Sequence, residues 1–488
     1  MKNHIFTLLL IWIFSAGCYK DKGNYEYTTL PEVIVTGLKE GQKFTAYVGE
    51  PFRIPVTVEV KNGDLADFSY EWKIEKEVVS TKKDLDIMVN KSARYAQLDV
   101  IHNNTGVRHV TFFEITVSSP FQYGWMILSD LGDKSQLCFL REDNVFVENA
   151  YHLQNNEYLG AGAYALCEHF LPWSSEIGQV FIACQQGPGY SVEIDGNTLQ
   201  KMVYTNQEFV DGVPADFLPQ SMNCVMNWDY LINNGKLYTR EQPNGVDALY
   251  QEGSFLNFPV AGDYELLPWT MMGNLVFNSD VLAFDKKTCS YVLLRNGEMK
   301  TFDTSRDETK AFNPSNMGKM LLGGGVCSSA SNRDDFVTFL KDMNTGKIYV
   351  QKFFFSGWNN RSFYTESEVE FPESDLIDED TKFAVCTGRN YAYFTNGKVL
   401  YVYNYAENIV EPLRTDFPTV IREIAISRAN PERLAIAFEN AEDASKSDFM
   451  VLDVSVVGKG KVIEGTEVKG KCGRVVDIIY KIGDQWSI

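Results

Sequence analysis

Hydrophobic and polar positions alternate in short runs along most of the chain after residue 30. Segment 51–60 places three valines on one face in its second half, and segment 69–74 alternates around Trp72. Segment 110–117 repeats the pattern. A period of two is that of a β-strand, because successive side chains point to opposite faces of a sheet. The pattern therefore predicts an all-β chain that begins with a group of strands at about residue 29.

Beyond Ser118-Ser119-Pro120 the chain shows almost no helical period. Pairs of aromatic-rich strands recur instead, each joined by a short turn that contains glycine, often as Asn-Gly. Asn-Gly is a strong signal for a hairpin, because both central residues must adopt positive φ. The glycines of these turns are Gly196, Gly235, Gly297, Gly346 and Gly397.

The spacing of these turns, roughly 40 to 60 residues, is typical of β-propeller blades. Dividing the remaining roughly 370 residues by about 50 predicts about seven blades over residues 121–488, with six or eight as alternatives. Segments 125–128 and 475–480 are both apolar, and we expect them to share one blade and close the ring. Two further β-sandwiches are the alternative architecture. Either way, residues 29–118 form the first domain.

The first residues have the layout of a bacterial signal peptide. Lys2 is basic, segment 5–14 is almost entirely apolar, and the small residues 15–17 follow. A membrane-spanning helix needs about 20 apolar residues, and this run is too short. We therefore expect residues 1–17 to be removed on export.

Ser15-Ala16-Gly17-Cys18 resembles the lipobox of bacterial lipoproteins, although that family usually has leucine where this chain has Ser15. The resemblance implies that Cys18 becomes the first residue of the mature protein and carries lipid. Residues 18–28 are polar and charged, as a tether beside a membrane should be. An ordinary secreted protein with a buried Cys18 is the alternative.

Residues 29–118 resemble an immunoglobulin-like β-sandwich of the polycystic-kidney-disease (PKD) type. The resemblance lies in Trp72 on a central strand, a late turn at Thr105-Gly106 and a final alternating strand over 113–117. No cysteine stands between residues 18 and 138, which excludes an antibody-type disulfide. We expect Trp72 to be a core residue.

Charge and composition exclude one class of partner. The chain has 488 residues, with 65 acidic against 45 basic side chains and a formal charge of −20. Nucleic acid is not expected as a partner, because binding a phosphate backbone needs clustered lysine and arginine. Hydrophobic residues make up 44% of the chain, which supplies large cores and excludes a disordered protein.

Eight cysteines follow Cys18, and none forms a pair with two intervening residues, which excludes common zinc and redox motifs. Most stand in apolar runs such as 137–139 and 182–184. A free cysteine behaves as a small buried hydrophobe, so we favour free thiols. Disulfides are the alternative, because an oxidising envelope permits them.

The chain contains no recognisable catalytic motif. Cys167-Glu168-His169 resembles a nucleophile site, but neighbouring side chains on a strand point to opposite faces. The acidic cluster 374–380 lacks the glycine and final glutamate of a calcium loop, so we expect a solvated loop, with Ca²⁺ as the alternative. Glycines 323–325 are predicted to let a strand pass near the propeller axis. We assign no catalytic residue, no metal ligand and no cofactor apart from the lipid; a carboxylate pair from separate blades, which would cleave glycosidic bonds, stays open.

Aromatic residues make up 13% of the chain, and they are the one abundant residue type that suggests a ligand-binding surface. Trp358, followed by Asn359 and Arg361 in a predicted loop, is the best candidate to stack on a sugar ring or a peptide side chain. Most other tryptophans are expected in blade cores. Those considered for the same binding face are Trp173, Trp228 and Trp269.

The lipobox, the tether, the PKD-like segment and the following segment 123–128 together resemble the PKD-like lipoproteins of the Bacteroidota. The resemblance implies a lipid-anchored, surface-exposed protein of the outer membrane, held by lipid on Cys18. It also implies a non-enzymatic role beside a nutrient importer of the SusC/SusD type, capturing oligosaccharide or oligopeptide or stabilising the complex. A secreted propeller hydrolase or lyase acting on a glycan and a structural or adhesive surface protein are the alternatives.

Overall fold

The computed structural model describes most of the chain between residues 31 and 482. The described ranges are 31–89, 91–169, 179–187, 190–225, 228–241, 254–273, 280–302, 310–330, 333–357 and 362–482. The chain divides into two compact units, Met1–Ser118 and Ser119–Ile488. The predicted signal, the tether and Cys18 lie outside the described residues. Within those residues, no helix has the length and apolar character needed to span a membrane.

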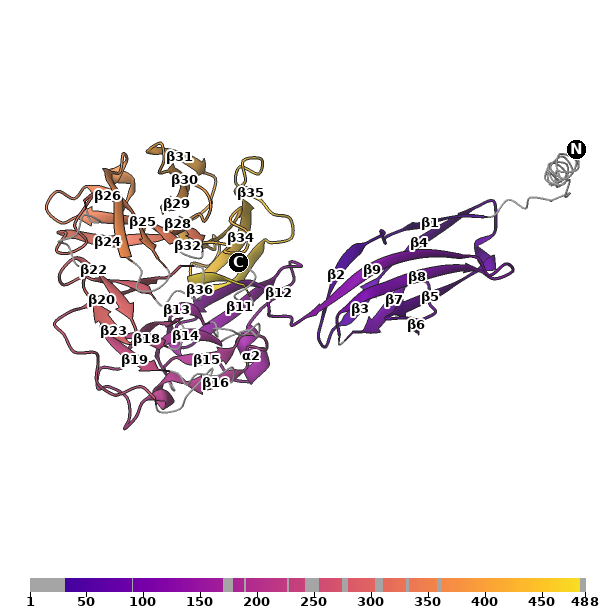
Figure 1. Cartoon of the computed structure of the whole chain (residues 1–488), viewed down its shortest axis with the longest axis horizontal. Helices are drawn as coiled ribbons and strands as arrows, with labels where there is room; N and C mark the ends of the chain where they lie inside the picture. The colour runs from indigo at the N-terminus through magenta and orange to yellow at the C-terminus, as the bar shows by residue number, and fades with distance from the viewer. Residues whose placement is uncertain are drawn as a thin grey trace, which may run out of the picture. The chain divides into compact units, whose positions relative to one another are not determined.

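The described part of the first unit is a β-sandwich (Figure 1). A five-stranded sheet has the order β2-β9-β8-β5-β6, and the shorter pairs β1-β4 and β3-β7 supply the opposing face of the core. Strand β2 runs parallel to β9, and the other pairs are antiparallel. The elements are β1 (Glu32–Thr36), β2 (Gln42–Tyr47), β3 (Pro51–Ile54), β4 (Thr57–Lys61), η1 (Leu65–Asp67), β5 (Phe68–Ile74), β6 (Glu77–Ser80), β7 (Leu85–Met88), β8 (Ala93–His102) and β9 (Arg108–Ser118).

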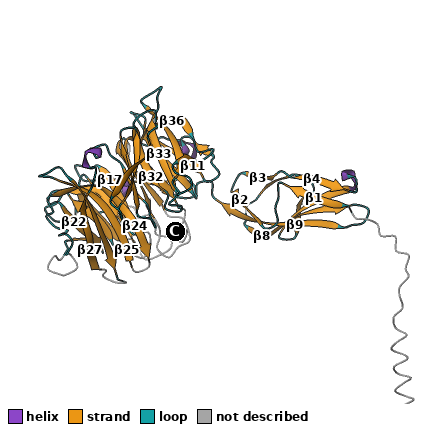
Figure 2. Ribbon diagram, turned by 90° about the horizontal axis from the view of Figure 1, so that it is seen from above, coloured by secondary structure: helices purple, strands orange, loops and turns teal. Residues whose placement is uncertain are grey.

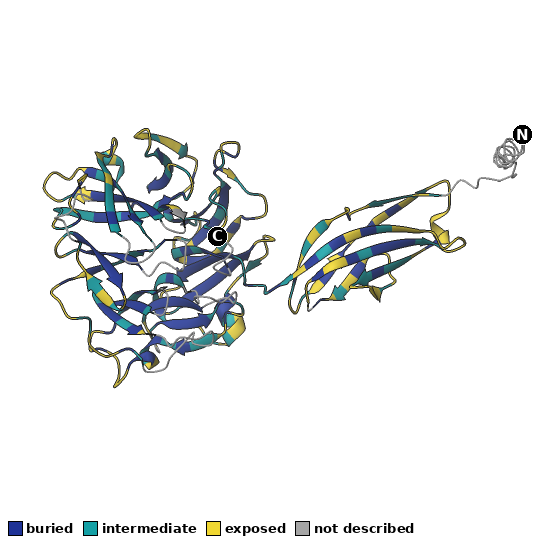
Figure 3. Ribbon diagram, viewed as in Figure 1, coloured by how far each residue is buried: buried dark blue, intermediate teal, exposed yellow. Residues whose placement is uncertain are grey.

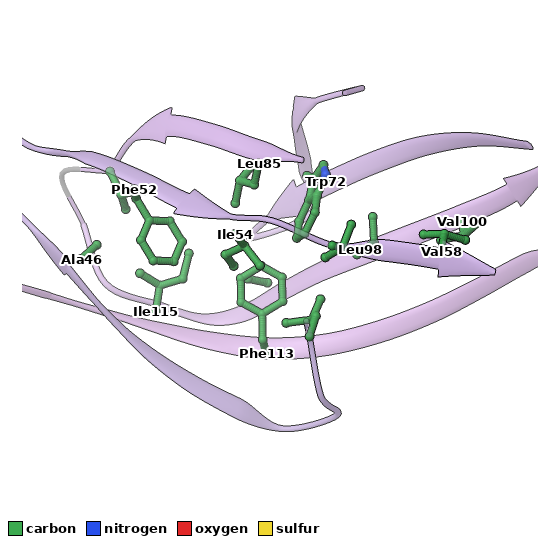
Figure 4. Close-up of a cluster of buried hydrophobic side chains, with 14 of the residues drawn as sticks. Ala46, Phe52, Ile54, Val58, Trp72, Leu85, Leu98, Val100, Phe113 and Ile115 are labelled. Atoms are coloured by element: carbon green, nitrogen blue, oxygen red, sulfur yellow. The ribbon is translucent and has the colours of Figure 1, made fainter. Parts of the chain in front are cut away.

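Trp72 lies at the centre of the sandwich core (Figure 4), as predicted. Its side chain is 0% exposed, and its ring meets Phe113 edge to face with the centroids 5.9 Å apart. The indole Nε1–H donates to the carbonyl oxygen of Lys82 at 2.9 Å and to that of Lys83 at 3.2 Å. A buried tryptophan needs such a partner, since an unpaired N–H away from water costs free energy. Trp72 is therefore fully committed to the core.

The sequence pattern treated 51–60 as one stretch, and the structure divides it at Pro55. Strand β3 pairs with β7, whereas β4 pairs with β1. Proline has no N–H to donate to a strand ladder, so the chain changes partner strands there. The predicted alternation still holds after the break, because Val56 and Val58 are buried.

The described strands of the second unit form seven blades (Figures 1 and 2). Blades 1 to 3 contain β10 (Gly124–Asp130), β11 (Ser135–Arg141), β12 (Phe146–Val147), β13 (Ala161–His169), β14 (Gln179–Gln186), β15 (Val192–Asp195), β16 (Lys201–Tyr204), β17 (Pro219–Val225), β18 (Trp228–Asn233) and β19 (Lys236–Glu241). Blades 4 and 5 contain β20 (Leu266–Met271), β21 (Val281–Asp285), β22 (Ser290–Arg295), β23 (Glu298–Lys300), β24 (Lys319–Ala330), β25 (Arg333–Asp342), β26 (Ile348–Ser356) and β27 (Ser362–Glu370).

Blades 6 and 7 complete the ring. Their strands are β28 (Phe383–Val385), β29 (Tyr391–Asn396), β30 (Val399–Asn404), β31 (Ile409–Arg414), β32 (Ile421–Ile426), β33 (Arg433–Glu439), β34 (Lys446–Asp453), β35 (Lys461–Val462) and β36 (Val468–Lys481). Short helices in this unit are α2 (Ala150–Asn155), η2 (Thr205–Glu208) and η4 (Ser374–Leu376). The inner strands contact one another in the order β36, β13, β17, β20, β24, β28, β32 and back to β36. The fold is thus a closed seven-bladed β-propeller, as predicted.

Burial follows the position of a strand within its blade (Figure 3). The middle strands β11 and β22 are buried along their whole length, whereas the outer strands β27, apart from Phe363, and β31 are half-buried or exposed. A middle strand is covered on both faces by the neighbouring blades, so both faces must be apolar. This explains why blade strands contain continuous apolar runs while the sandwich strands alternate.

The predicted Asn-Gly turns join neighbouring strands of the blades. Asn234 and Gly235 connect β18 to β19 with φ of 46° and 72°. Asn296 and Gly297 connect β22 to β23 with φ of 51° and 73°. Positive φ at both central residues matches the twist of the flanking strands, and asparagine and glycine adopt it at least cost.

Strand β36 closes the ring. Its first half pairs with β34 in blade 7, with Cys472 opposite Ser447. Its second half pairs with β10 in blade 1, with Ile478 opposite Ile127 and Tyr480 opposite Trp125. The predicted latch between 125–128 and 475–480 is therefore confirmed. Closure removes the open sheet edges that a long all-β chain must otherwise protect.

Candidate functional site

The seven inner strands enclose a cavity of about 510 Å³ on the axis of the propeller. Each inner strand contributes to its wall, because each blade presents its first strand to the axis. The residues that line the cavity include Cys167, Asn223, Trp269, Val385, Arg428 and Asp477. Pockets that bind small ligands commonly measure about 300 to 1,000 Å³, so this cavity is large enough to hold one.

Glycines 323–325 lie on β24 and make room for the neighbouring inner strand. A Cβ atom on Gly323 would stand 2.8 Å from Cδ2 of Phe383, and one on Gly325 would stand 2.9 Å from Cβ of Val385. Both distances are shorter than ordinary van der Waals contact. The glycines therefore allow β24 to pass close to β28 at the axis, as predicted, and they do not form a phosphate loop.

Asp477 on β36 lines the cavity and ties blade 1 to blade 2. One carboxylate oxygen accepts a hydrogen bond from the N–H of Leu166 on β13 at 2.7 Å, and the other accepts from the N–H of Ile478 at 2.8 Å. Burial raises the pKa of Asp477 to about 6, although the two backbone hydrogen bonds oppose the shift. Both oxygens are thus occupied by the backbone.

Glu423 on β32 lies beside the same cavity. Its Oε2 stands 3.4 Å from Nζ of Lys382, and its Oε1 accepts from the N–H of Ile424 at 3.1 Å. Burial raises the pKa of Glu423 to about 7; Lys382 lowers it, and the negative charge of Asp477 raises it further. Two carboxylates from separate blades therefore interact near the axis, and Lys382 lowers the pKa of both.

The rest of the wall combines a flat aromatic ring with groups that form hydrogen bonds. Trp269 on β20 is half-buried, packs against the core between blades 4 and 5, and is one of the residues that line the cavity. Asn223 donates from its amide to the hydroxyl of Thr270, and Arg428 adds a guanidinium to the wall. An aromatic surface beside a few polar groups is the usual composition of a site for a polar organic ligand.

The structure describes some of the binding residues predicted from the sequence and leaves others outside its described ranges. Trp358, Asn359 and Arg361 lie outside the described residues, as does Trp173. Trp269 lines the axial cavity. Trp228 packs in the core between blades 3 and 4, where a Cβ atom on Gly297 would meet its ring.

The other chemical candidates do not form a catalytic group. Burial raises the pKa of the Cys167 thiol to about 12, which disfavours the thiolate that a nucleophile requires. Glu168 accepts a hydrogen bond from the N–H of Ile482, and the side chain of His169 lies outside the described residues. In the acidic cluster, Asp378 accepts hydrogen bonds from the N–H of Asp380 and the hydroxyl of Thr381. Among the described residues, no group of three or more histidine, cysteine, aspartate or glutamate side chains is placed to hold a metal ion.

Sequence reasoning did not identify Asp477, Glu423 or Lys382 as site residues. A signal was present for two of them, because Asp477 interrupts an apolar run in β36 and Glu423 stands, beside Arg422, in the otherwise apolar strand β32. A charged residue in a buried strand requires a partner and is a site candidate for that reason. Only the ring closure shows that the two residues, 54 positions apart, interact.

A second buried polar cluster lies between blades 2 and 3, away from the cavity. Arg240 on β19 forms ion pairs with Glu193, Glu208 and Asp229, and all four side chains are 0% exposed. Burial and the neighbouring Glu208 raise the pKa of Glu193 well above its ordinary value. Burial raises the pKa of Glu208 as well, and the charge of Arg240 lowers the pKa of both glutamates. The cluster joins the two blades internally.

A model of the PKD-like family matches residues 18–162. The match includes the described sandwich, which is PKD-like, and extends into the first blade of the propeller. No curated protein matches the chain.

Solved structures with similar folds include propellers from different sources. A quinonprotein alcohol dehydrogenase-like protein from Bacteroides thetaiotaomicron is 13% identical with a TM-score of 0.42, and the match covers 93% of this chain and 100% of that one. The β-propeller domain of Cps50 (Swd1) from Myceliophteria thermophila is 8% identical with a TM-score of 0.40, covering 68% of this chain and 97% of that one. Such values carry no functional argument, and the propeller assignment rests on the strand pairing described above.

Proposed function

We propose that this chain is a lipid-anchored protein of the outer-membrane surface that captures an oligosaccharide or oligopeptide for a SusC/SusD-type importer. The observation that carries the proposal is the axial cavity of about 510 Å³, which presents Trp269 together with hydrogen-bonding side chains. A non-enzymatic role is supported by the hydrogen bonds and the ion pair that engage the two carboxylates near the axis. Both oxygens of Asp477 accept backbone hydrogen bonds, and Glu423 is held by Lys382 and by the N–H of Ile424.

The proposed location rests on the amino terminus. Ser15-Ala16-Gly17-Cys18 follows a short apolar run, and the PKD-like family match begins at residue 18. Acylation of Cys18 would hold the protein at a membrane, because each buried methylene contributes about 0.8 kcal/mol. The PKD-like sandwich and the propeller fit a surface accessory protein, and the importer is the partner that we propose for it.

The binding proposal is tested by calorimetric titration of the purified protein with panels of oligosaccharides and oligopeptides. We expect Trp269→Ala to weaken binding by about tenfold, because the variant loses the aromatic surface of the cavity. Phe258→Ala is the matched control, since Phe258 is 61% exposed and does not line the cavity. Equal affinities of the wild type and Trp269→Ala for every ligand would exclude the cavity as the site.

The location and the partner are tested together in cells. We expect the wild-type protein to incorporate a palmitate analogue, to be cleaved by protease added to intact cells, and to co-purify with an importer in mild detergent. Cys18→Ala should lose all three properties, because it removes the acylated thiol. A wild-type protein that runs alone and binds neither glycan nor peptide would contradict the proposal.

A second candidate function is cleavage of a glycan, by hydrolysis or by elimination, and one observation favours it. Glu423 and Asp477 come from separate blades and have pKa values of about 7 and about 6, near the range of a catalytic acid and base. If this function holds, Glu423→Gln should abolish release of reducing ends from a glycan while leaving its affinity intact. An unchanged rate would exclude it.

A further inference from the structure

The closing strand β36 passes directly against β11 near Cys472. The side chain of Gln136 on β11 donates through Nε2 to the carbonyl oxygen of Lys471 at 3.2 Å and accepts through Oε1 from the N–H of Gly473 at 2.9 Å. These two backbone groups lie on either side of Cys472. The backbone of Cys472 is therefore fixed against the face of β11 that carries Gln136.

Cys138 stands on that same face, two residues after Gln136. Side chains two positions apart on a strand point in one direction and are about 7 Å apart along it. Cys138 and Cys472 are 0% and 1% exposed and pack in one apolar cluster with Ile127 and Phe449. The Cys138 thiol lies close enough to Cys472 to raise the pKa of the Cys472 thiol. The two side chains are therefore near neighbours within one packed cluster.

The two thiols differ from the other cysteines in having each other as partners. Cys138 and Cys472 are both thiols, not joined by a disulfide, in this structure. The thiol of Cys184 contacts the hydroxyl of Ser135, and that of Cys386 contacts the carbonyl oxygen of Pro431. We propose that Cys138 and Cys472 are joined by a disulfide bond that closes the propeller ring covalently.

The oxidation proceeds by exchange with the disulfide of a thiol oxidoreductase or of a small dithiol oxidant. One cysteine loses its proton, attacks the oxidant's disulfide and forms a mixed disulfide, which releases one oxidant thiolate. The second cysteine, also deprotonated, then attacks the first and releases the other oxidant thiolate. The chain loses two protons and two electrons, and the oxidant's disulfide is reduced to two thiols. This inference rests on the proposed function, because export to an oxidising compartment is what would bring the chain to its natural oxidant.

The order of events follows from burial. After the ring has closed, both sulfurs are buried, and the neighbouring Cys138 thiol together with burial raises the pKa of Cys472. Attack requires a thiolate, so the bond must form while β36 docks. Once formed, it is shielded from reductants. It links the first blade to the last strand, so it spans nearly the whole propeller.

The test maps thiols by mass spectrometry in two preparations of the full chain. The first is mature protein purified from membranes, and the second is reduced protein refolded in a buffer of glutathione and glutathione disulfide. Each is denatured with iodoacetamide present and no reductant, and then digested. We expect one linked peptide pair that contains Cys138 and Cys472 and that disappears on reduction. We also expect protein refolded with excess reductant, and therefore without the link, to unfold at a midpoint about 5 °C lower.

The two preparations separate this inference from the proposed location. Complete alkylation of Cys138 and Cys472 in both would overturn the disulfide. A link in the refolded protein alone would uphold the bond and would contradict export to an oxidising compartment. Cys184→Ser is the matched control and should keep the link, whereas Cys138→Ser should leave Cys472 fully alkylated. Because the link is measured on the wild type, the result stands even where a variant does not fold.

Discussion

Asp477 and Glu423 are half-buried carboxylates on inner strands, and each has specific partners. Asp477 is held by the N–H groups of Leu166 and Ile478, and Glu423 by Lys382 and the N–H of Ile424. Such groups stabilise a strand register when they are satisfied and are costly when they ionise without a partner. Their ionisation therefore affects the stability of the propeller.

Glu423 makes stability depend on pH in a defined direction. Its folded-state pKa of about 7 lies above the ordinary value of 4.5. Between these values the folded state binds more protons than the unfolded state, so the free energy of unfolding falls as pH rises from about 4.5 to 7. We expect Glu423→Gln to be more stable than the wild type at pH 8 by roughly 2 to 3 kcal/mol and nearly equal to it at pH 5.

Urea denaturation at the two pH values measures this difference. Glu411→Gln on the outer strand β31 is the control, because Glu411 is exposed and its substitution should change little. A Glu423→Gln variant that is less stable than the wild type at pH 8 would show that the charged form is favoured in the folded state.

Strand β24 can lie close to the neighbouring inner strand because three of its residues are glycines. Glycines 323–325 weaken the strand intrinsically, because they bury no side chain and lose more conformational freedom. The close approach of Phe383 and Val385 on β28 explains why larger residues are absent there. The packing of neighbouring inner strands sets the composition of this element.

A double-mutant cycle tests this packing. Gly323→Ala places a methyl group 2.8 Å from Cδ2 of Phe383, and we expect a loss of about 1 to 3 kcal/mol from overpacking. Phe383→Leu removes the obstructing ring, so the double variant should lose at least about 1 kcal/mol less than the sum of the single changes. Additive losses in chemical denaturation would mean that the glycine serves the backbone of β24 instead.

The propeller depends on one strand that belongs to two blades. Strand β36 is the outer strand of blade 7 in its first half and the inner strand of blade 1 in its second half. Without it, β10 would expose an unpaired edge, and blades 1 and 7 would lose their shared apolar core. Closure is therefore the step that completes the whole unit.

Ile478→Asp tests closure, because Ile478 is 4% exposed and lies opposite Ile127. A buried unpaired carboxylate at this position should lower the free energy of unfolding by at least about 3 kcal/mol and increase light scattering. Lys469→Asp, at an exposed position of the same strand, should change stability by less than about 0.5 kcal/mol. Equal stabilities of the two variants would show that the latch contributes little.

The division at Ser118 predicts two independent unfolding units. We expect an expressed segment 29–118 to unfold cooperatively, with its midpoint within about 3 °C of the sandwich transition in the full chain. Trp72 fluorescence in the isolated segment gives the measurement, since this indole lies in the core. A segment that fails to fold alone would show that the sandwich depends on the propeller.

Much of the architecture follows from local patterns. The period of two, the Asn-Gly turns at 234–235 and 296–297, and the matching apolar segments near residues 125 and 478 predicted strands, hairpins and ring closure. Such features are local because side-chain direction and turn dihedrals depend on a few adjacent residues. The break at Pro55 was missed, because the choice of partner strand depends on the opposing sheet.

Periodicity and turn motifs alone predicted an all-β chain, a sandwich followed by a propeller of about seven blades, and a blade shared by the first and last strands of the propeller. Only the tertiary structure brought Asp477 to Glu423 beside a common cavity and Cys138 to Cys472 against a common face. The physical reason is distance along the chain. Local periodicity fixes which face of a strand is buried, but the closure of seven blades decides which distant residues share that buried space.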